Sequence, residues 1–87
     1  EDYDKAAETY EQFLTERPGD AGFLYNLACA ESRLGRKDSA LKHLRQCVET
    51  EERFKQDAIG DPDFDAIRDD PEFSAITGQA DSTGAGS

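Results

Sequence analysis

Several residue types are missing or rare in this chain of 87 residues. It has no Met or Trp, one His, two Cys and three Pro, and its 10 Lys and Arg are outnumbered by 20 Asp and Glu. Two cysteines are too few for the disulfide framework of a small secreted protein, so we expect a reducing compartment, the cytoplasm. The net charge of -10 argues against nucleic acid and anionic membranes as partners, and it leaves cations and basic proteins.

Long apolar runs are absent as well. No stretch approaches the roughly 20 residues that span a bilayer, and residues 1–4 are acidic where a signal peptide is basic. The chain has no initiator Met, so we expect a piece of a longer protein. Its length allows one small domain with a thin core, which excludes the two-domain architectures of most enzymes.

Apolar residues recur three or four positions apart over the first two thirds of the chain, which predicts helices rather than strands. A first helix is expected over 3–17. A second begins after Asp20, a good N-cap, and ends at Gly35, a good C-terminal cap. A third begins near Lys37 or Asp38. The pattern therefore predicts an all-α fold.

The last third contains a short internal repeat. Asp61-Pro62-Asp63-Phe64-Asp65-Ala66-Ile67 recurs nine residues later as Asp70-Pro71-Glu72-Phe73-Ser74-Ala75-Ile76. In each copy Asp suits the N-cap, Pro suits the first helical position, and the next acid favours the positive end of the helix dipole. Both copies are expected to form short helices. Residues 78–87 have nothing to bury and are expected to be a disordered tail.

A longer period identifies the fold. Ala6, Tyr10 and Phe13 align with Ala40, Leu44 and Cys47 at an offset of 34 residues, the period of the tetratricopeptide repeat. One complete unit carries residues of the expected size at its signature positions, namely Leu24, Leu27, Ala28, Gly35, Ala40, Leu44 and Cys47. The chain therefore resembles a tetratricopeptide repeat protein, at the C-terminal end of its array.

The resemblance implies an antiparallel helix-hairpin solenoid. Residues 1–54 would hold the second helix of one repeat (3–17) and a full repeat (21–54), and residues 55–77 would form C-terminal capping helices. The apolar residues of this cap are Phe54, Ile59, Phe64, Ile67, Phe73 and Ile76. The first repeat lacks its first helix, so weak self-association through that N-terminal face is an alternative to a monomer.

The resemblance also implies a function, since such arrays bind a peptide or a partner helix in a groove. Position by position, the groove residues of the complete unit are Tyr25, Asn26, Cys29 and Arg33. The acidic surface favours a basic or amphipathic protein partner. The alternative is a structural cap or connector of a longer array with no ligand of its own.

Other chemistry is less well supported. The acids Asp61, Asp63, Asp65, Asp69 and Glu72 have the oxygen spacing of a calcium loop. Ala66 stands, however, where that loop requires Gly, and capped short helices explain the same acids. His43 and Cys47 are four residues apart on one helix, but zinc sites need three or four ligands. We therefore expect no bound metal, no cofactor and no catalysis.

Overall fold

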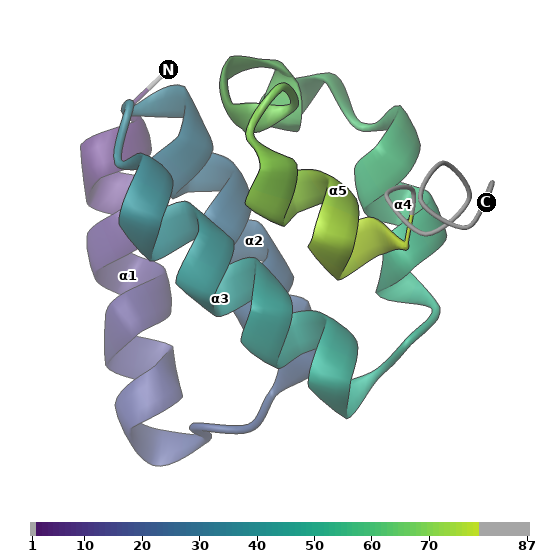
Figure 1. Cartoon of the computed structure of the whole chain (residues 1–87). Helices are drawn as coiled ribbons and strands as arrows, with labels where there is room; N and C mark the ends of the chain where they lie inside the picture. Colours follow the sequence, from purple (N-terminus) through teal and green to yellow (C-terminus); the bar gives the residue numbers. More distant parts are fainter. Residues whose placement is uncertain (1, 79–87) are drawn as a thin grey trace, which may run out of the picture.

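The computed structural model describes residues 2–78. The elements are α1 Tyr3–Glu16, α2 Ala21–Arg33, α3 Lys37–Thr50, α4 Phe54–Gly60, the 3-10 helix η1 Pro62–Ile67 and α5 Pro71–Thr77. No β-strand occurs within these residues. The predicted all-α fold is therefore confirmed (Figure 1).

Local signals set the ends of α2. The Asp20 side chain accepts the backbone N–H of Phe23 at 3.1 Å, which caps the helix at its start. At its end Gly35 has a φ of +80°, a left-handed conformation that favours glycine. The Arg36 N–H then reaches back to the Glu31 carbonyl oxygen at 2.8 Å, as in a Schellman motif. The chain reverses within this turn, and α3 runs back along α2.

The helices α1, α2 and α3 lie side by side, each running opposite to the one before it (Figure 1). Between α2 and α3, Ala28 and Ala40 are fully buried in one cluster with Leu44. Their small size lets the two helices approach closely. Leu27 faces the other way and packs with Ala7 of α1. The middle helix is thus buried on two sides.

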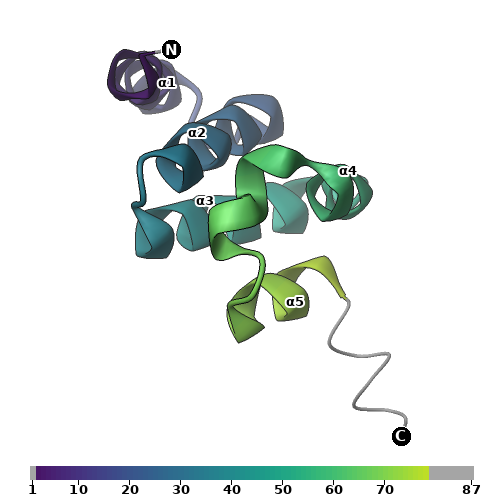
Figure 2. The same cartoon turned by 90° about the horizontal axis from the view of Figure 1, so that it is seen from above.

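The C-terminal elements cover the exposed side of this layer. Figure 2 shows η1 lying across α2, while α5 lies against α3. Five of the six apolar residues assigned to the cap are buried, and Ile59 is half-buried. The buried five are Phe54, Phe64, Ile67, Phe73 and Ile76. Segments 61–67 and 70–76 therefore contribute to the main core rather than forming an appendage.

Within residues 2–78 no helix is long and apolar enough to cross a membrane. Gly78 follows the last residue of α5, and its φ of +84° again suits glycine. Most of the expected disordered tail, residues 79–87, lies outside the described residues.

Candidate functional site

A pocket of about 210 Å³ opens between α1, α2 and the start of η1. Its lining residues are Tyr3, Ala6 and Tyr10 from α1, Tyr25, Asn26, Cys29 and Ala30 from α2, and Asp61 and Asp63 from the cap. Three segments far apart in the sequence thus form one site. Three of the four predicted groove residues, Tyr25, Asn26 and Cys29, belong to it.

The helical walls combine aromatic and small side chains. Tyr3, Ala6 and Tyr10 recur at three- and four-residue spacing, so they share one face of α1. Tyr25 is half-buried, and its ring stacks on Phe54 with 5.0 Å between the ring centroids. Asn26 is exposed, and its amide is accessible to a partner.

Asp61 connects the cap to α2. Its Oδ2 accepts the Tyr25 hydroxyl at 2.7 Å and lies 3.8 Å from the Cys29 Sγ. Its Oδ1 accepts the backbone N–H of Asp63 at 2.9 Å, which caps η1. One carboxylate therefore starts the short helix and fixes it to two side chains of the pocket.

Arg33 stands at the edge of the pocket and is held from two sides. Its Nη2 lies 2.7 Å from the Asp63 Oδ1, and its Nε donates to the same oxygen at 2.8 Å. Its guanidinium also lies over the Tyr3 ring, 5.9 Å from the centroid. Arg33 is thus engaged within the chain, in contact with both a carboxylate and an aromatic wall of the site.

The charges of the pocket favour a positively charged ligand. Burial and the hydrogen bond to Asp61 raise the pKa of Tyr25 well above its ordinary value of 10.0. Burial and the nearby charges of Asp61 and Asp63 likewise raise the pKa of Cys29. Both groups therefore stay protonated at neutral pH, and the negative charge of the pocket resides on its carboxylates.

The predicted calcium ligands are only partly brought together. Asp61 and Asp63 lie with Cys29 so that their ligand atoms are within 4.8 Å of one another. Asp65 instead pairs with Arg68 at 3.1 Å, and Glu72 pairs with Arg45. The carboxylates are thus distributed among several separate contacts, including the caps of short helices.

Of the other pair considered for a metal, Cys47 lies in the core and His43 is half-buried. His43 Nδ1 is 2.7 Å from the Oε1 of Glu31, which is only 2% exposed. Cys47 is fully buried, and burial raises its pKa to about 12. A thiol that keeps its proton is a poor metal ligand, because metals bind the thiolate. In the structure His43 contacts Glu31 of α2, and Cys47 packs with Leu24 and Phe54.

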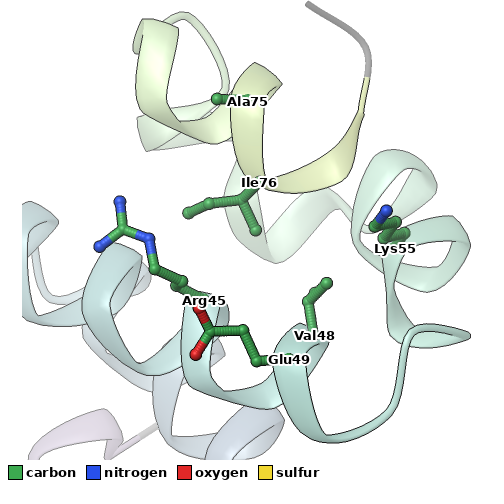
Figure 3. A pocket seen from close by; sticks show the side chains of 6 residues that line it. All are labelled: Arg45, Val48, Glu49, Lys55, Ala75 and Ile76. Carbon is green, nitrogen blue, oxygen red and sulfur yellow. The ribbon is translucent and has the colours of Figure 1, made fainter. Parts of the chain in front are cut away.

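Another cavity, of about 310 Å³, opens between α3, α4 and α5 (Figure 3). It is lined by Arg45, Val48, Glu49, Lys55, Ala75 and Ile76. Arg45 is paired with Glu72 of α5, and Lys55 is paired with Glu52 at 3.0 Å. No predicted groove residue lines this cavity, and both of its basic groups are paired with carboxylates of the chain. We therefore place the candidate site in the pocket on α2.

Comparison with known proteins agrees with this architecture. Residues 21–54 match the family model of the tetratricopeptide repeat. The chain contains a tetratricopeptide repeat. Searches of curated proteins and of solved structures gave no match. The match covers α2 and α3, so the pocket lies on the first helix of the repeat. The repeat indicates a role in protein–protein interaction or as a scaffold.

Six lining residues are not among the predicted groove residues, and four of them, Tyr3, Tyr10, Asp61 and Asp63, carry polar groups. Tyr3 and Tyr10 share one face of α1, but their spacing predicts only a helix and not a wall of the groove. Asp61 and Asp63 were singled out as possible calcium ligands and helix caps, not as walls of the groove. Only the folded chain places both pairs next to Tyr25, since 36 residues separate Tyr25 from Asp61.

Proposed function

We propose that this chain is a protein-interaction module that binds a basic or amphipathic segment of a partner protein in the pocket on α2. The proposal assigns no catalytic step to the chain. The observation that supports it most is the composition of the pocket, in which tyrosine side chains and two carboxylates surround an exposed Asn26 on the repeat's first helix.

The groups of the pocket have complementary roles in this proposal. The amide of Asn26 can pair with the backbone of an extended peptide, because it both donates and accepts hydrogen bonds. The tyrosines offer rigid apolar surface with polar ends, as is common at interfaces. The carboxylates and the net charge of -10 steer a basic segment toward the site and make its binding sensitive to salt.

The ion pair of Arg33 bears on the charge of the segment that the pocket can bind. An arginine in a groove could pair with a carboxylate of a ligand, but here its guanidinium is bound to Asp63. The groups left to contact a ligand are therefore the Asp61 carboxylate and the tyrosine side chains. Because Asp61 is negative, a basic segment fits the pocket better than an acidic one.

A titration with two simple peptides tests the proposal. The probe is an acetylated octapeptide of alternating lysine and leucine, and its control replaces every lysine by glutamate. We expect saturable shifts of the Tyr25 and Asn26 amide signals with the lysine peptide, weakened as salt is raised. Equal responses to both peptides, or none to either, would support a purely structural cap or connector instead.

Two matched variants localise the interaction. Asn26→Ala removes an exposed amide at the pocket, and Gln46→Ala removes an exposed amide on α3. We expect Asn26→Ala to weaken binding of the lysine peptide by about two- to tenfold, the effect of losing one hydrogen bond. Gln46→Ala should leave its affinity unchanged, and an equal loss in both variants would place binding elsewhere.

A further inference from the structure

The carboxylate of Asp61 accepts several hydrogen bonds, but it forms no ion pair with a basic side chain of residues 2–78. It accepts the N–H of Asp63, the hydroxyl of Tyr25 and, more weakly, the thiol of Cys29. An ionised carboxylate has about four acceptor sites. Within residues 2–78, however, no Lys, Arg or His forms an ion pair with Asp61. The group therefore attracts a cation but has little left to offer a hydrogen-bond donor.

This mismatch distinguishes between kinds of cation. A primary ammonium has three N–H donors and is strongly hydrated, so it loses bonds to water that Asp61 cannot replace. A quaternary ammonium has no donors and carries an apolar shell of methyl groups. It loses no hydrogen bonds on entry and still gains the attraction of the carboxylate.

The remaining walls suit such a group. Tyr3, Tyr10 and Tyr25 line the same pocket, and Ala6 and Ala30 supply its other apolar surface. Aromatic rings attract cations through their π faces, most strongly where the cation is poorly hydrated. Arg33 already rests its guanidinium over the Tyr3 ring, so this wall holds a cation within the folded chain.

We propose that the pocket binds the trimethylammonium group of a trimethylated lysine on the partner segment. The inference rests on the proposed function and specifies the side chain that the segment inserts. Asp61 supplies the charge, Tyr3 and Tyr10 supply aromatic surface from α1, and Asn26 lies where the backbone of the segment passes.

The protonation state of the pocket supports this assignment. Burial, with Asp61 nearby, raises the pKa values of Tyr25 and Cys29. Both side chains therefore remain donors to Asp61 at neutral pH, and its acceptor sites stay taken. A neighbour that titrated near pH 7 would free those sites and remove the preference against a primary ammonium.

Three peptides of one sequence test the inference on the full chain. They carry at one position a lysine, an Nε-trimethyl-lysine, or its uncharged analogue in which carbon replaces the nitrogen. By calorimetric titration we expect the trimethyl-lysine peptide to bind about tenfold more tightly than either of the others, the scale of a desolvated cation–π contact. A lysine peptide that binds equally well would overturn the inference and leave the proposed function standing. Failure of all three peptides would overturn both.

The chain offers a matched pair of variants for the charge. Asp61→Asn keeps an oxygen that can cap η1 but removes the negative charge from the pocket. Asp70→Asn makes the same change at the cap of α5, where the carboxylate pairs with Lys37 away from the pocket. We expect Asp61→Asn to abolish the preference for trimethyl-lysine and Asp70→Asn to keep it. Circular dichroism verifies that both variants fold, and loss of the preference in both would contradict the assignment.

Two further measurements separate the aromatic contribution and the source of the ligand. Tyr10→Leu keeps apolar bulk but removes a ring, so the preference for trimethyl-lysine should fall about threefold. Choline chloride carries the same head group without a peptide. We expect it to bind much more weakly than the trimethyl-lysine peptide, and choline that binds as tightly would overturn the assignment to a protein partner.

Discussion

The two copies of the Asp-Pro-acid-Phe segment dock on different helices by the same contacts. Asp61 and Asp70 each accept the backbone N–H two residues ahead, at 2.9 and 2.8 Å. Phe64 and Phe73 are both fully buried, and their ring centroids are 5.8 Å apart. In each copy, therefore, the Asp caps a short helix and the Phe three residues later packs its ring into the core.

The receiving helices follow the same pattern, with one difference. Each receiving helix has one side chain that donates to the capping Asp of its segment. Eight residues later, the same helix has an arginine that pairs with the second acid of the segment. The pairs are Tyr25–Asp61 with Arg33–Asp63 on α2, and Lys37–Asp70 with Arg45–Glu72 on α3. The donor to Asp70 is a cation, whereas the donor to Asp61 is a neutral phenol. The second copy is therefore balanced in charge, and the first leaves a negative charge beside a pocket.

The largest expected effect tests whether both copies contribute equally to the core. Phe64→Ala and Phe73→Ala should each lower the free energy of unfolding by about 3–5 kcal/mol, because each removes a fully buried ring. Urea denaturation followed by circular dichroism measures this. Phe13→Ala, at a ring that is 46% exposed, is the control and should cost much less. A small loss at only one of the two buried rings would break the equivalence of the copies.

The features that the sequence predicted depend on neighbouring residues. The Asp20 cap, the Gly35 turn and the two short helices are decided within a few positions, and the structure has all of them. The repeat was found because its size pattern recurs at a fixed offset. Tyr25 and Asn26 were placed in a groove through that resemblance, and both line the pocket.

The features that the sequence did not predict depend on distant residues. The buried Glu31 is hydrogen-bonded to His43, twelve positions away on the next helix. Nothing in the sequence near Glu31 indicates this partner. The Arg33–Asp63 pair likewise joins residues thirty positions apart. Such pairs are selected by how the elements pack, which periodicity does not specify.

The second prediction concerns the neutral donor that distinguishes the first copy. Tyr25→Phe removes a hydrogen bond to a carboxylate and should cost about 1.5–3 kcal/mol at pH 7. Urea denaturation again measures it. A cost near zero would mean that water replaces the phenol, and that the first copy docks without its polar contact.

The same phenol gives the stability of the chain an alkaline limit. Folding raises the pKa values of Tyr25 and Cys29 above ordinary values of 10.0 and 9.0, so the folded state holds protons that the unfolded chain releases. The stability that these groups contribute is complete below about pH 9 and is lost as the pH rises further. Denaturation at pH 7 to 11 with a reducing agent should show this loss. Tyr25→Phe should show a shallower slope, and an unchanged slope would assign the loss to other groups.

The third prediction compares the two caps. Asp61→Ala and Asp70→Ala should each cost about 1 kcal/mol, because each leaves a helix without its N-cap acceptor. The loss at Asp61 should be larger, since the Tyr25 hydroxyl also loses its acceptor, whereas Asp70 loses only its partly exposed pair with Lys37. Asp69→Ala, at an exposed acid between the two copies, controls for the change in charge. Equal effects of all three substitutions would indicate that net charge rather than capping controls stability.

The smallest effects on stability are expected at the two arginines. Their substitutions should differ instead in how strongly the chain binds the lysine octapeptide. Arg33→Met and Arg45→Met break half-exposed ion pairs, each worth about 0.2–1 kcal/mol, and both keep an apolar stem. Arg33 also places a positive charge at the pocket, whereas Arg45 lies beside α5. Removing this like charge should strengthen binding of the lysine octapeptide about threefold in Arg33→Met. Arg45→Met should bind as the wild type does. If both variants gained affinity equally, the peptide would be responding to the net charge of the chain, and the difference between the two copies would have no role in binding.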